Sequence, residues 1–463
     1  MVDELDDGAG EICYGTVMTT EPVHTSAPYG IIGHDAASLV RSVENAVITG
    51  ALHPGETLPS VRALAKHLGM SPTTVAGAYR DLRQRGVLVT HDRSRTVVAH
   101  RPPLAVRLAP ELAPGTVDLA SGNPDPALLP DLAGPWSRVA PAHRLYGAEV
   151  RSPELVRLAR QDLAQDGIPT DHLAVVGGGL DGIERVLEVH CRPGDHVAIE
   201  DPGYAGTLDL VRSLGLLPAP VAVDDAGMLP DELAAALERG ATTVLQIPRA
   251  HNPTGATLTA ERATDLRTVV ARFPDVLVVE DDHAGPISGA PYHRIVEGHA
   301  RWATIRSVAK WLGPDLRVAI LVGDDDTVTR VLGRQRLGTG WVSHLLQDLT
   351  AATWEAARSE GTLREAAARY AERRGHLLAA LRAAEVLAWG ASGLNVWVPV
   401  HEEVPVVQGL ANRGWAVQAG EAYRIGSPPA IRITTAALPT ERVPDLVSDF
   451  LTVLGRRLGT RRG

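Results

Sequence analysis

The 463-residue sequence contains only two cysteines, Cys13 and Cys191, so neither a disulfide framework nor a zinc cluster is available to it. It has no apolar run long enough to cross a membrane. The first residues, MVDELDDGAGE, are acidic, whereas a secretory signal peptide begins with basic and then apolar residues. These absences predict a cytoplasmic protein without a membrane anchor and without a bound metal.

Lysine is also scarce. Of 45 basic residues only Lys66 and Lys310 are lysine, and the others are arginine. Arginine cannot lose its proton in a protein and therefore cannot form a Schiff base, whereas lysine can. A lysine in so arginine-rich a chain therefore suggests nucleophilic chemistry. The residues around Lys66 and Lys310 must decide which of the two lysines has this role.

Length and charge both indicate more than one domain. A chain of 463 residues is too long for a single ordinary core, and 44% hydrophobic with 22% charged residues is normal for globular protein. The net charge of -10 is unevenly spread, because residues 1–34 hold six acidic and no basic side chains. Residues 35–100 hold eight basic against five acidic side chains. A small positive module on an acidic body can meet the phosphates of nucleic acid.

The N-terminal hundred residues divide into two parts. Residues 1–34 lack hydrophobic periodicity, so we expect most of them to form a disordered tail. Residues 35–100 show the helical spacing of apolar residues, and Ser60 and Ser71 stand at N-cap positions, the second followed by Pro72. The pattern predicts three helices, which begin near Asp35, Val61 and Pro72, and a two-stranded wing from residues 87–89 and 96–98.

A proline-containing linker, residues 101–116, precedes a change of pattern. Beyond it, strands alternate with helices, which is typical of an α/β fold. The strands are almost continuously apolar, as in a parallel sheet buried on both faces. We expect residues 117–463 to form this large domain, with a smaller C-terminal subdomain. The expected strands are 173–178, 196–201, 243–248, 276–281, 303–307 and 317–323 in the large sheet, and 394–400 and 430–435 in the subdomain.

The third predicted helix is the DNA-binding candidate. Thr73, Thr74 and Arg80 lie on or beside one exposed stripe, while the apolar residues fall at core spacing. A helix that enters the major groove needs short polar groups near its N-terminus and arginines that reach phosphate or guanine. For any one residue a solvated helical face is the alternative. With the basic loop of the wing, the candidate contacts are Ser71, Thr73, Thr74, Arg80, Arg62, Arg93 and Arg95.

The whole segment is more specific than its single residues. LPSVRALAKHLGMSPTTVAGAYRDLRQRGVL closely resembles the winged helix of the GntR family, and the resemblance covers about residues 37–99. The family commonly has arginine where this chain has Pro72. Its wing usually holds Gly-x-Gly-Thr where this chain has residues 93–96, Arg-Ser-Arg-Thr. The resemblance implies a double-stranded DNA operator as partner.

Several polar residues follow predicted strands of the large domain. Lys310 lies between two strand candidates, Asp281 ends another, and Asn252 begins an Asn-Pro-Thr-Gly turn after a third. Residues 177–179, three glycines, lie between a strand and a helix, where backbone amides receive a phosphate. In α/β proteins, ligands bind at the carboxyl ends of the strands. Each feature alone is weak, but their order and spacing together indicate a ligand site.

At this point the chain resembles fold-type I pyridoxal-phosphate enzymes of the aspartate aminotransferase class over roughly residues 115–463. Lys310 in Ser-x-x-Lys matches the lysine that bonds covalently to the cofactor, and Asp281 matches the carboxylate that keeps the pyridine nitrogen protonated. Asn252 matches the partner of the phenolic oxygen, Tyr204 the stacking aromatic, and Arg432 the arginine that binds a substrate carboxylate. The phosphate contacts implied are Gly178, Gly179, Ser307, Arg317 and, from the second subunit of a homodimer, Tyr146.

The chain departs from this pattern at three places. His283 stands where the family usually has a tyrosine near the phenolic oxygen, so it joins the cofactor-binding candidates. The turn at 177–179 lacks the usual hydroxyl side chain, and Leu180 replaces a common polar residue. These changes retune cofactor binding without removing the chemistry of Lys310 and Asp281.

The order of the two modules is the most specific signal, because it resembles the MocR subfamily of GntR regulators. This resemblance implies a regulator whose aminotransferase-like domain dimerises and senses pyridoxal 5'-phosphate or an amine or amino-acid effector. A working aminotransferase with a DNA-binding appendage remains the alternative, and a cofactor-free dimeric scaffold is a third hypothesis. The intact winged helix, which an enzyme would not need, favours the regulator, while Lys310 argues against the scaffold.

Overall fold

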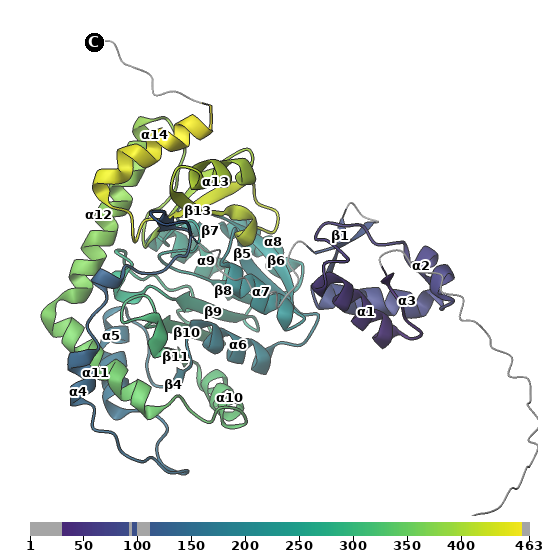
Figure 1. The fold of residues 1–463 in the computed structure, drawn as a ribbon. Helices are drawn as coiled ribbons and strands as arrows, with labels where there is room; N and C mark the ends of the chain where they lie inside the picture. Colours follow the sequence, from purple (N-terminus) through teal and green to yellow (C-terminus); the bar gives the residue numbers. More distant parts are fainter. Residues whose placement is uncertain (1–29, 92–94, 100–111, 456–463) are drawn as a thin grey trace, which may run out of the picture. The chain divides into compact units, whose positions relative to one another are not determined.

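The computed structural model describes residues 30–91, 95–99 and 112–455 of the 463-residue chain (Figure 1). Nearly all of the expected N-terminal tail, most of the expected linker, and Arg93 lie outside these ranges. The described chain forms two compact units, one mainly from residues up to His100 and one mainly from residues beyond it. Within the described ranges no helix has the length and apolar character needed to cross a bilayer.

The N-terminal unit contains the three expected helices. The Asp35 carboxylate caps the first helix by accepting from Ser38 N at 2.7 Å, and Ser60 caps the second by accepting from Ala63 N. The second helix ends at Gly69, whose left-handed φ of 65° suits glycine. The apolar residues expected at core positions of the third helix are fully buried, and these are Val75, Ala78, Tyr79 and Leu82. The helices are α1 (Ala36–Ile48), α2 (Val61–Leu68) and α3 (Pro72–Gln84).

The wing pairs β1 (Leu88–His91) with β2 (Arg95–Val98). The sequence did not predict that the turn between α1 and α2 also pairs with the wing. Gly55 N donates to Val98 O at 2.9 Å and Leu58 N donates to Thr96 O at 2.8 Å, so this turn lies along β2. Tyr79 fixes α3 to the same region, since its buried ring carries a hydroxyl that donates to Pro59 O at 2.8 Å.

An eight-stranded sheet organises the C-terminal unit, in the order β4-β11-β10-β9-β8-β5-β6-β7. The central strands β10, β9, β8 and β5 are parallel, as the apolar runs predicted, and β6, which was not predicted, pairs with β5 in parallel as well. β11 is antiparallel to both of its neighbours, so the expectation of a uniformly parallel sheet was wrong there. The bounds are β4 (Leu173–Val176), β5 (His196–Asp201), β6 (Leu217–Asp224), β7 (Gly227–Met228), β8 (Ala241–Gln246), β9 (Leu277–Asp282), β10 (Trp302–Ser307) and β11 (Ala319–Gly323).

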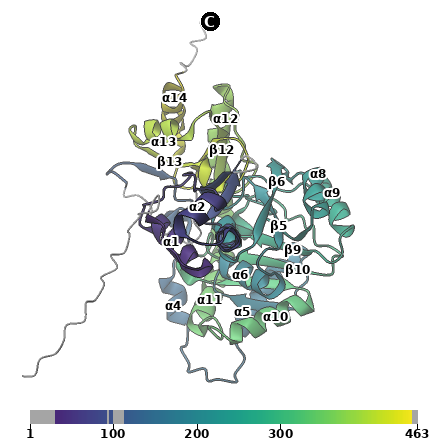
Figure 2. The ribbon, with the colours of Figure 1, turned by 90° about the vertical axis from the view of Figure 1, so that its right-hand side faces the viewer.

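Helices cover both faces of this sheet (Figures 1 and 2). One apolar cluster joins one set of strand side chains to helices α5, α8, α9 and α11. A second cluster joins the alternate set to α6, α7 and α10. The helices are α4 (Ala133–Arg138), α5 (Pro153–Gln165), α6 (Gly179–His190), α7 (Ala205–Ser213), α8 (Pro230–Glu238), α9 (Ala260–Ala271), α10 (Asp325–Arg336) and α11 (His344–Glu360), with short 3-10 turns η2 (Pro126–Leu128), η3 (Gly285–Ile287) and η4 (Pro314–Leu316).

The subdomain contains a four-stranded sheet in the order β12-β14-β13-β3. Its edge strand β3 comes from the start of the unit and pairs in parallel with β13, which places residues 117–119 beside the C-terminal part of the chain. Neither β3 nor β13 was predicted. The bounds are β3 (Val117–Leu119), β12 (Asn395–Pro399), β13 (Trp415–Ala419), β14 (Ala430–Thr434), α12 (Thr362–Ala383), α13 (Glu403–Ala411), α14 (Val443–Val453), η5 (Gly420–Tyr423) and η6 (Thr440–Arg442).

Candidate cofactor site and DNA-binding surface

The parallel strands bring most of the predicted site residues to one edge of the large sheet. Asp281 is the last residue but one of β9, and Ser307 ends β10, which pairs with β9 in parallel. Lys310 follows in the turn after β10. The carboxyl ends of neighbouring parallel strands meet at one edge, so their side chains converge there.

Lys310 contacts the start of the unit. Its Nζ donates a 2.7 Å hydrogen bond to Gly122 O, three residues beyond β3. Burial, and then the positive charge of Arg432, lowers the pKa of Lys310 to about 8. A substantial fraction of this amine is therefore neutral near physiological pH, as a nucleophilic lysine requires.

Asp281 has a buried carboxylate with an unused acceptor. Its Oδ1 has no hydrogen-bond partner among the described residues. Burial raises the pKa of Asp281 to about 7, with further contributions from the charges of Asp282 and Glu200. A buried acceptor without a donor is costly unless a ligand supplies one. The protonated pyridine nitrogen of the expected cofactor is such a donor, so Asp281 fits this group.

The glycine turn before α6 lies beside Asp281, Ser307 and Arg317. A Cβ on Gly179 would lie 3.7 Å from Asp281 Oδ1 and 3.6 Å from Ser307 Cβ. A Cβ on Gly178, whose φ is +117°, would lie 2.7 Å from Nη2 of Arg317, and this nitrogen donates to Gly177 O at 3.0 Å. The N-terminus of a twelve-residue helix, a guanidinium and a hydroxyl thus surround one point, which fits a phosphate.

Arg432 and Asn252 contact each other at the opposite side of the site. Arg432 Nη1 donates to Asn252 Oδ1 at 3.0 Å, and its Nη2 donates to Ala120 O. Arg432 is buried, its Nε has no hydrogen-bond partner among the described residues, and burial lowers its pKa. A buried guanidinium that donates only to neutral oxygens can still bind a carboxylate by donating hydrogen bonds to it.

Tyr204 and His283 complete the buried set. Tyr204 lies at the N-cap of α7, and a Cβ on Gly206 would be 2.8 Å from its ring, so only glycine leaves room there. Burial raises the pKa of the Tyr204 hydroxyl. Burial and the charge of Lys310 lower the pKa of His283 to about 3, which leaves its imidazole neutral. The roles assigned to both residues stay predictions.

Tyr146 is the one predicted cofactor contact that the structure does not bring to this set. It is 93% exposed, and its ring packs edge-on against Trp341 with centroids 5.6 Å apart. The resemblance assigned Tyr146 to the site of a second subunit, and this role stays a prediction.

Sequence reasoning missed the segment that crosses the site after β3. The Asp118 carboxylate accepts from Ala120 N and Ser121 N at 2.9 Å, which folds this segment over Lys310 and Arg432. Gly122 has a φ of +70°, and a Cβ there would lie 3.1 Å from Arg432 Nη2. The only signal was the Ser-Gly-Asn-Pro run at 121–124, which reads as an ordinary turn.

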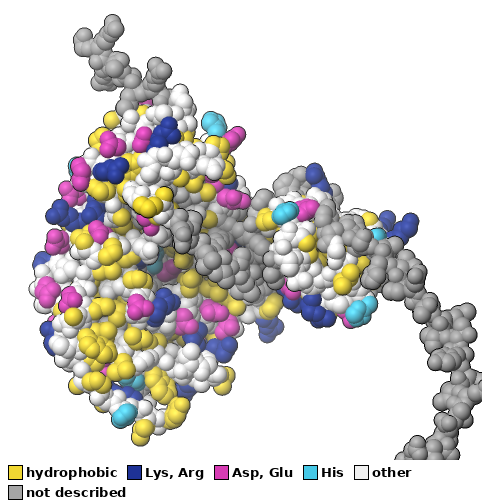
Figure 3. Space-filling view, viewed as in Figure 1, with side chains coloured by type: hydrophobic (Ala, Val, Ile, Leu, Met, Phe, Trp, Pro, Cys, Tyr) yellow, Lys and Arg dark blue, Asp and Glu magenta, His cyan; other side chains and the backbone are white. Residues whose placement is uncertain are grey.

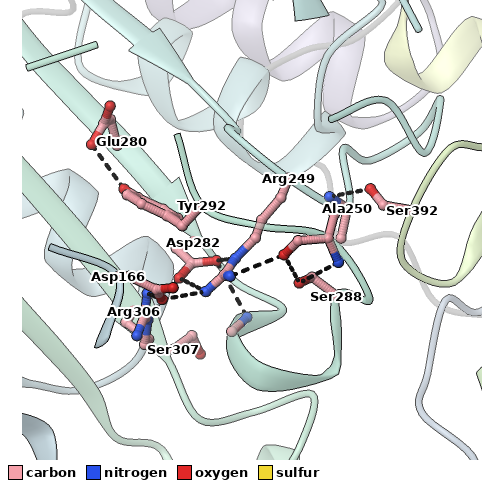
Figure 4. Close-up of polar contacts among 12 residues, drawn as sticks. Asp166, Arg249, Ala250, Glu280, Asp282, Ser288, Tyr292, Arg306, Ser307 and Ser392 are labelled. Carbon is pink, nitrogen blue, oxygen red and sulfur yellow. Dashed lines mark hydrogen bonds and ion pairs between the residues drawn. The ribbon is translucent and has the colours of Figure 1, made fainter. Parts of the chain in front are cut away.

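A buried ionic cluster surrounds Asp282, the residue that follows Asp281 and ends β9 (Figure 4). Asp282 accepts from Arg249 Nε at 2.9 Å and from Arg306 Nε at 2.6 Å. The two guanidinium groups hold the pKa of Asp282 far below its usual range against its burial. Both arginines also reach Asp166, at 3.0 Å from Arg249 and 2.6 Å from Arg306. Asp282 is therefore already paired, whereas its neighbour Asp281 is available for a ligand.

The DNA-binding candidates lie on the surface of the N-terminal unit. Ser71, Thr73, Arg62, Arg80 and Arg95 are exposed, and Thr74 is half-buried. Ser71 Oγ accepts from Thr74 N at 3.0 Å and lies 2.7 Å from Thr74 Oγ1, so this pair caps α3. Capping is therefore the role that the structure shows for Ser71 and Thr74, and DNA contact stays a prediction for all six.

The sequence matches known families in both units. Residues 36–98 match the family described as bacterial regulatory proteins, gntR family, and residues 145–450 match aminotransferase class I and II. The chain is 37% identical to the vitamin B6 salvage pathway transcriptional repressor PtsJ of Salmonella typhimurium over 431 residues, which are 92% of this chain and 100% of that protein. It is 30% identical to the HTH-type transcriptional regulator TauR of Rhodobacter capsulatus, over 63% of this chain and 68% of that protein.

Solved structures agree on the fold of the larger unit. The kynurenine aminotransferase of Pyrococcus horikoshii superimposes with a TM-score of 0.68 at 20% identity, over 74% of this chain and 91% of that one. An archaeal alanine:glyoxylate aminotransferase superimposes with a TM-score of 0.67 at 21% identity, over 73% and 90%. At this identity the likeness supports the fold alone.

The fold and the site define a DNA-binding transcription regulator with a winged helix and a pyridoxal-phosphate-type aminotransferase unit. With both family matches and a full-length relative, the chain belongs to the MocR subfamily of GntR regulators. The expectations of a GntR winged helix, a fold-type I aminotransferase unit and pyridoxal 5'-phosphate as cofactor are thereby confirmed.

Proposed function

We propose that this regulator senses pyridoxal 5'-phosphate, or an amine or amino acid that reacts with it, and changes its affinity for DNA in response. The unused acceptor of Asp281, set beside a lysine of lowered pKa, is the observation that carries this proposal. The full-length relative PtsJ is named as a repressor of vitamin B6 salvage, which supports the cofactor itself as the signal. Such a regulator works beside DNA, in the cytoplasm.

Each residue would contribute a separate part of the recognition. When bound, pyridoxal phosphate supplies an aldehyde and an electron-withdrawing ring. Lys310 provides the amine for the covalent bond, and Asp281 accepts a hydrogen bond from the ring nitrogen. The N-terminus of α6 and Arg317 bind the phosphate, while Arg432 binds the carboxylate of an amino acid.

We further propose that the protein is a homodimer. Tyr146 is exposed beside Trp341, and more large apolar side chains are exposed along and near α4, α10 and α11. In Figure 3, apolar side chains gather over the part of this unit where Figure 1 places α4 and α11. A second copy would cover this surface and bring its own Tyr146 to the phosphate. The exposed apolar residues there are Leu132, Trp136, Leu145, Tyr146, Leu337 and Leu345.

A binding titration tests the sensing proposal. A DNA duplex selected by the full-length protein from a random pool is titrated with cofactor-free and cofactor-loaded protein at one fixed salt concentration, because salt alone changes such affinities strongly. We expect the two affinities to differ, and cofactor affinity to change by the same factor when DNA is present. Equal DNA affinity in both forms, and also with amino acids added, would leave the large unit as a tether.

A catalytic aminotransferase is the second candidate. It is favoured by the contact between Arg432 and Asn252, which places a carboxylate-binding group within the site. A transaminase must convert the bound cofactor to its aminated form with an amino acid and return it with a keto acid, whereas a sensor needs only to bind. Absorbance spectra recorded with a panel of amino acids, followed by keto acids, distinguish the two.

A further inference from the structure

The carboxylate of Asp201 binds a loop from the far end of the chain. Asp201 ends β5 and is 6% exposed. Its Oδ1 accepts from Ile425 N at 2.9 Å and from Ser427 Oγ at 2.8 Å. Its Oδ2 accepts from Gly426 N at 2.7 Å and from Ser427 N at 3.0 Å. Four donors, three of them consecutive backbone amides, therefore surround one buried carboxylate.

This arrangement is an anion site that the protein fills with its own side chain. Successive backbone N–H groups that converge on one point bind anions in many proteins. Hydrogen bonds to an ionised acceptor are stronger than those between neutral groups. Asp201 therefore holds the loop 424–429, which joins η5 to β14, firmly to the end of β5 in the large sheet.

The loop next to Asp201 joins two segments that lie at the ligand site, those of Tyr423 and Arg432. Tyr423 precedes it, and Tyr423 O accepts from Gly203 N at 2.8 Å. The buried ring of Tyr423 lies 5.0 Å from the guanidinium carbon of Arg432. On the strand side, Tyr204 follows Asp201 by three residues. The carboxylate of Asp201 thus connects the segment of the proposed stacking residue with the segment that packs against Arg432.

A second carboxylate holds the other side of the same loop. Glu403 Oε1 accepts from Ala430 N at 3.1 Å and lies 2.9 Å from Arg424 Nε, while its Oε2 accepts from Glu421 N at 2.6 Å. Glu403 belongs to α13 of the subdomain. Its contacts fix the loop within the subdomain, whereas the contacts of Asp201 fix it to the large sheet.

We propose that Asp201 is a positioning residue for ligand recognition. It sets the place of Arg432, through the loop and Tyr423, relative to the cofactor face at Tyr204 and Asp281. This inference rests on the proposed function, in which Arg432 binds a ligand carboxylate. Loss of the Asp201 charge should therefore weaken recognition of the carboxylate far more than binding of the cofactor part, which is held by Asp281, Lys310 and the phosphate turn.

Two stable probes isolate the carboxylate. N-phosphopyridoxyl-L-alanine and N-phosphopyridoxyl-ethylamine differ only in the carboxylate, and neither can react with Lys310. Each is titrated calorimetrically into full-length protein freed of its cofactor. We expect wild type to prefer the alanine probe by roughly 10- to 100-fold, as for a charge-assisted contact. Arg432→Ala should abolish this preference.

The variants then test Asp201 itself. In Asp201→Asn, the amide NH2 meets a backbone N–H donor in either orientation, so we expect the preference for the alanine probe to fall by about tenfold. Affinity for the ethylamine probe should change by less than about threefold. Ser427→Ala, which removes one of the four bonds, should give a smaller loss of the same sign. Asp224→Asn is the matched control, because the carboxylate of Asp224 lies at the end of β6 and pairs with Arg262 away from the site.

The outcomes separate this inference from the proposed function. If wild type shows no preference for the alanine probe, the role of Arg432 is wrong and the positioning role of Asp201 is overturned with it. If Arg432→Ala abolishes the preference but Asp201→Asn preserves it, only the inference on Asp201 is overturned. Equal losses for both probes in Asp201→Asn, with Ser427→Ala unchanged, would show a purely structural role and would also overturn it.

Discussion

The Nζ atom of Lys310 lies 2.7 Å from the carbonyl oxygen of Gly122, a residue 188 positions earlier in the chain. The same short segment also accepts a hydrogen bond from Arg432, at Ala120 O. One stretch of backbone therefore contacts both the amine that would bond to the cofactor and the guanidinium that would bind a carboxylate. The positive charge of Arg432 influences Lys310, because it lowers the pKa of the Lys310 amine.

The first prediction concerns that influence. Arg432→Gln removes a positive charge that lowers the pKa of Lys310, so this pKa should rise from about 8 toward its usual value. The neutral amine is the reactive form, and the rate of covalent cofactor capture should increase with pH and level off above the pKa. The midpoint of the pH–rate curve, followed by absorbance between about pH 6 and 10, should move upward in the variant. A midpoint that stays in place would contradict the electrostatic coupling, and Arg262→Gln serves as control.

The second prediction concerns the cost of keeping Asp281 ready for a ligand. Its folded pKa of about 7 lies above the unfolded value of 3.8, so the folded state binds more protons between these limits. Stability of the cofactor-free protein should therefore fall as pH rises through this window. Asp281→Asn removes that cost, so at pH 8 the cofactor-free variant should be more stable than wild type by roughly 2–4 kcal/mol. The advantage should vanish below about pH 4.

Denaturant unfolding of the cofactor-free proteins at pH 4, 6 and 8 measures this difference. The same variant should bind pyridoxal phosphate more weakly, since an amide cannot hold the ring nitrogen protonated. A stability difference that is independent of pH would show that Asp281 is already ionised or differently paired in the folded protein.

Asp282 should behave in the opposite way. Its carboxylate bonds to Arg249 and Arg306, and Asp282→Asn would leave two buried guanidinium groups short of charge. We expect a loss of about 3–5 kcal/mol in the free energy of unfolding. The pKa of Asp282 is far below its usual range, so its contribution should be fully present at neutral pH and lost only in strong acid. A variant as stable as wild type would contradict this, and Asp224→Asn is an exposed control.

The contrast between Asp281 and Asp282 shows where sequence reasoning succeeds and where it ends. The strand pattern predicts that β9 ends near these residues, and alternation predicts that they face opposite sides. The resemblance selected Asp281. Neither source could reveal that Asp282 is paired, because Arg249 and Arg306 look like any other arginine in a chain that has dozens of them.

Other elements were missed for physical reasons. β6 contains Pro218 and Pro220, which argue against a strand in a sheet interior, yet it pairs with β5. β3 has only three residues, too few for a period to be read. Asp201 ends a predicted strand, but the sequence gives no sign of its role, because its partners Ile425–Ser427 lie more than two hundred residues away. Local pattern predicts elements, but it does not predict contacts over such separations.

The fourth prediction separates capping from DNA contact in α3. Ser71→Ala removes the cap at Thr74 N and should cost about 1 kcal/mol of stability in the N-terminal unit. Thr73→Ala changes an exposed side chain without a capping bond, so it should leave the melting temperature unchanged and weaken only DNA binding. Thermal unfolding and binding to the selected duplex are measured in parallel. If Thr73→Ala binds DNA like wild type, Thr73 is merely solvated.

The last prediction tests whether a second subunit completes the site. Tyr146→Ala should weaken cofactor binding in its own homodimer, and Lys310→Ala should abolish the borohydride-reducible bond. In a mixed dimer, one site combines Lys310 of the first chain with the partner subunit's Tyr146, while the other site lacks both. Equal mixing after subunit exchange should thus restore about one tight, reducible site per four chains. The count comes from titrating cofactor at low concentration, reducing with borohydride and quantifying the labelled chain by mass spectrometry.

Wild type mixed with Lys310→Ala gives the reference affinity. If the chains in the mixture capture the cofactor only with the weak affinity of the Tyr146→Ala homodimer, then Tyr146 does not act across the interface. If light scattering finds only monomers at micromolar concentration with cofactor bound, the dimer itself is wrong.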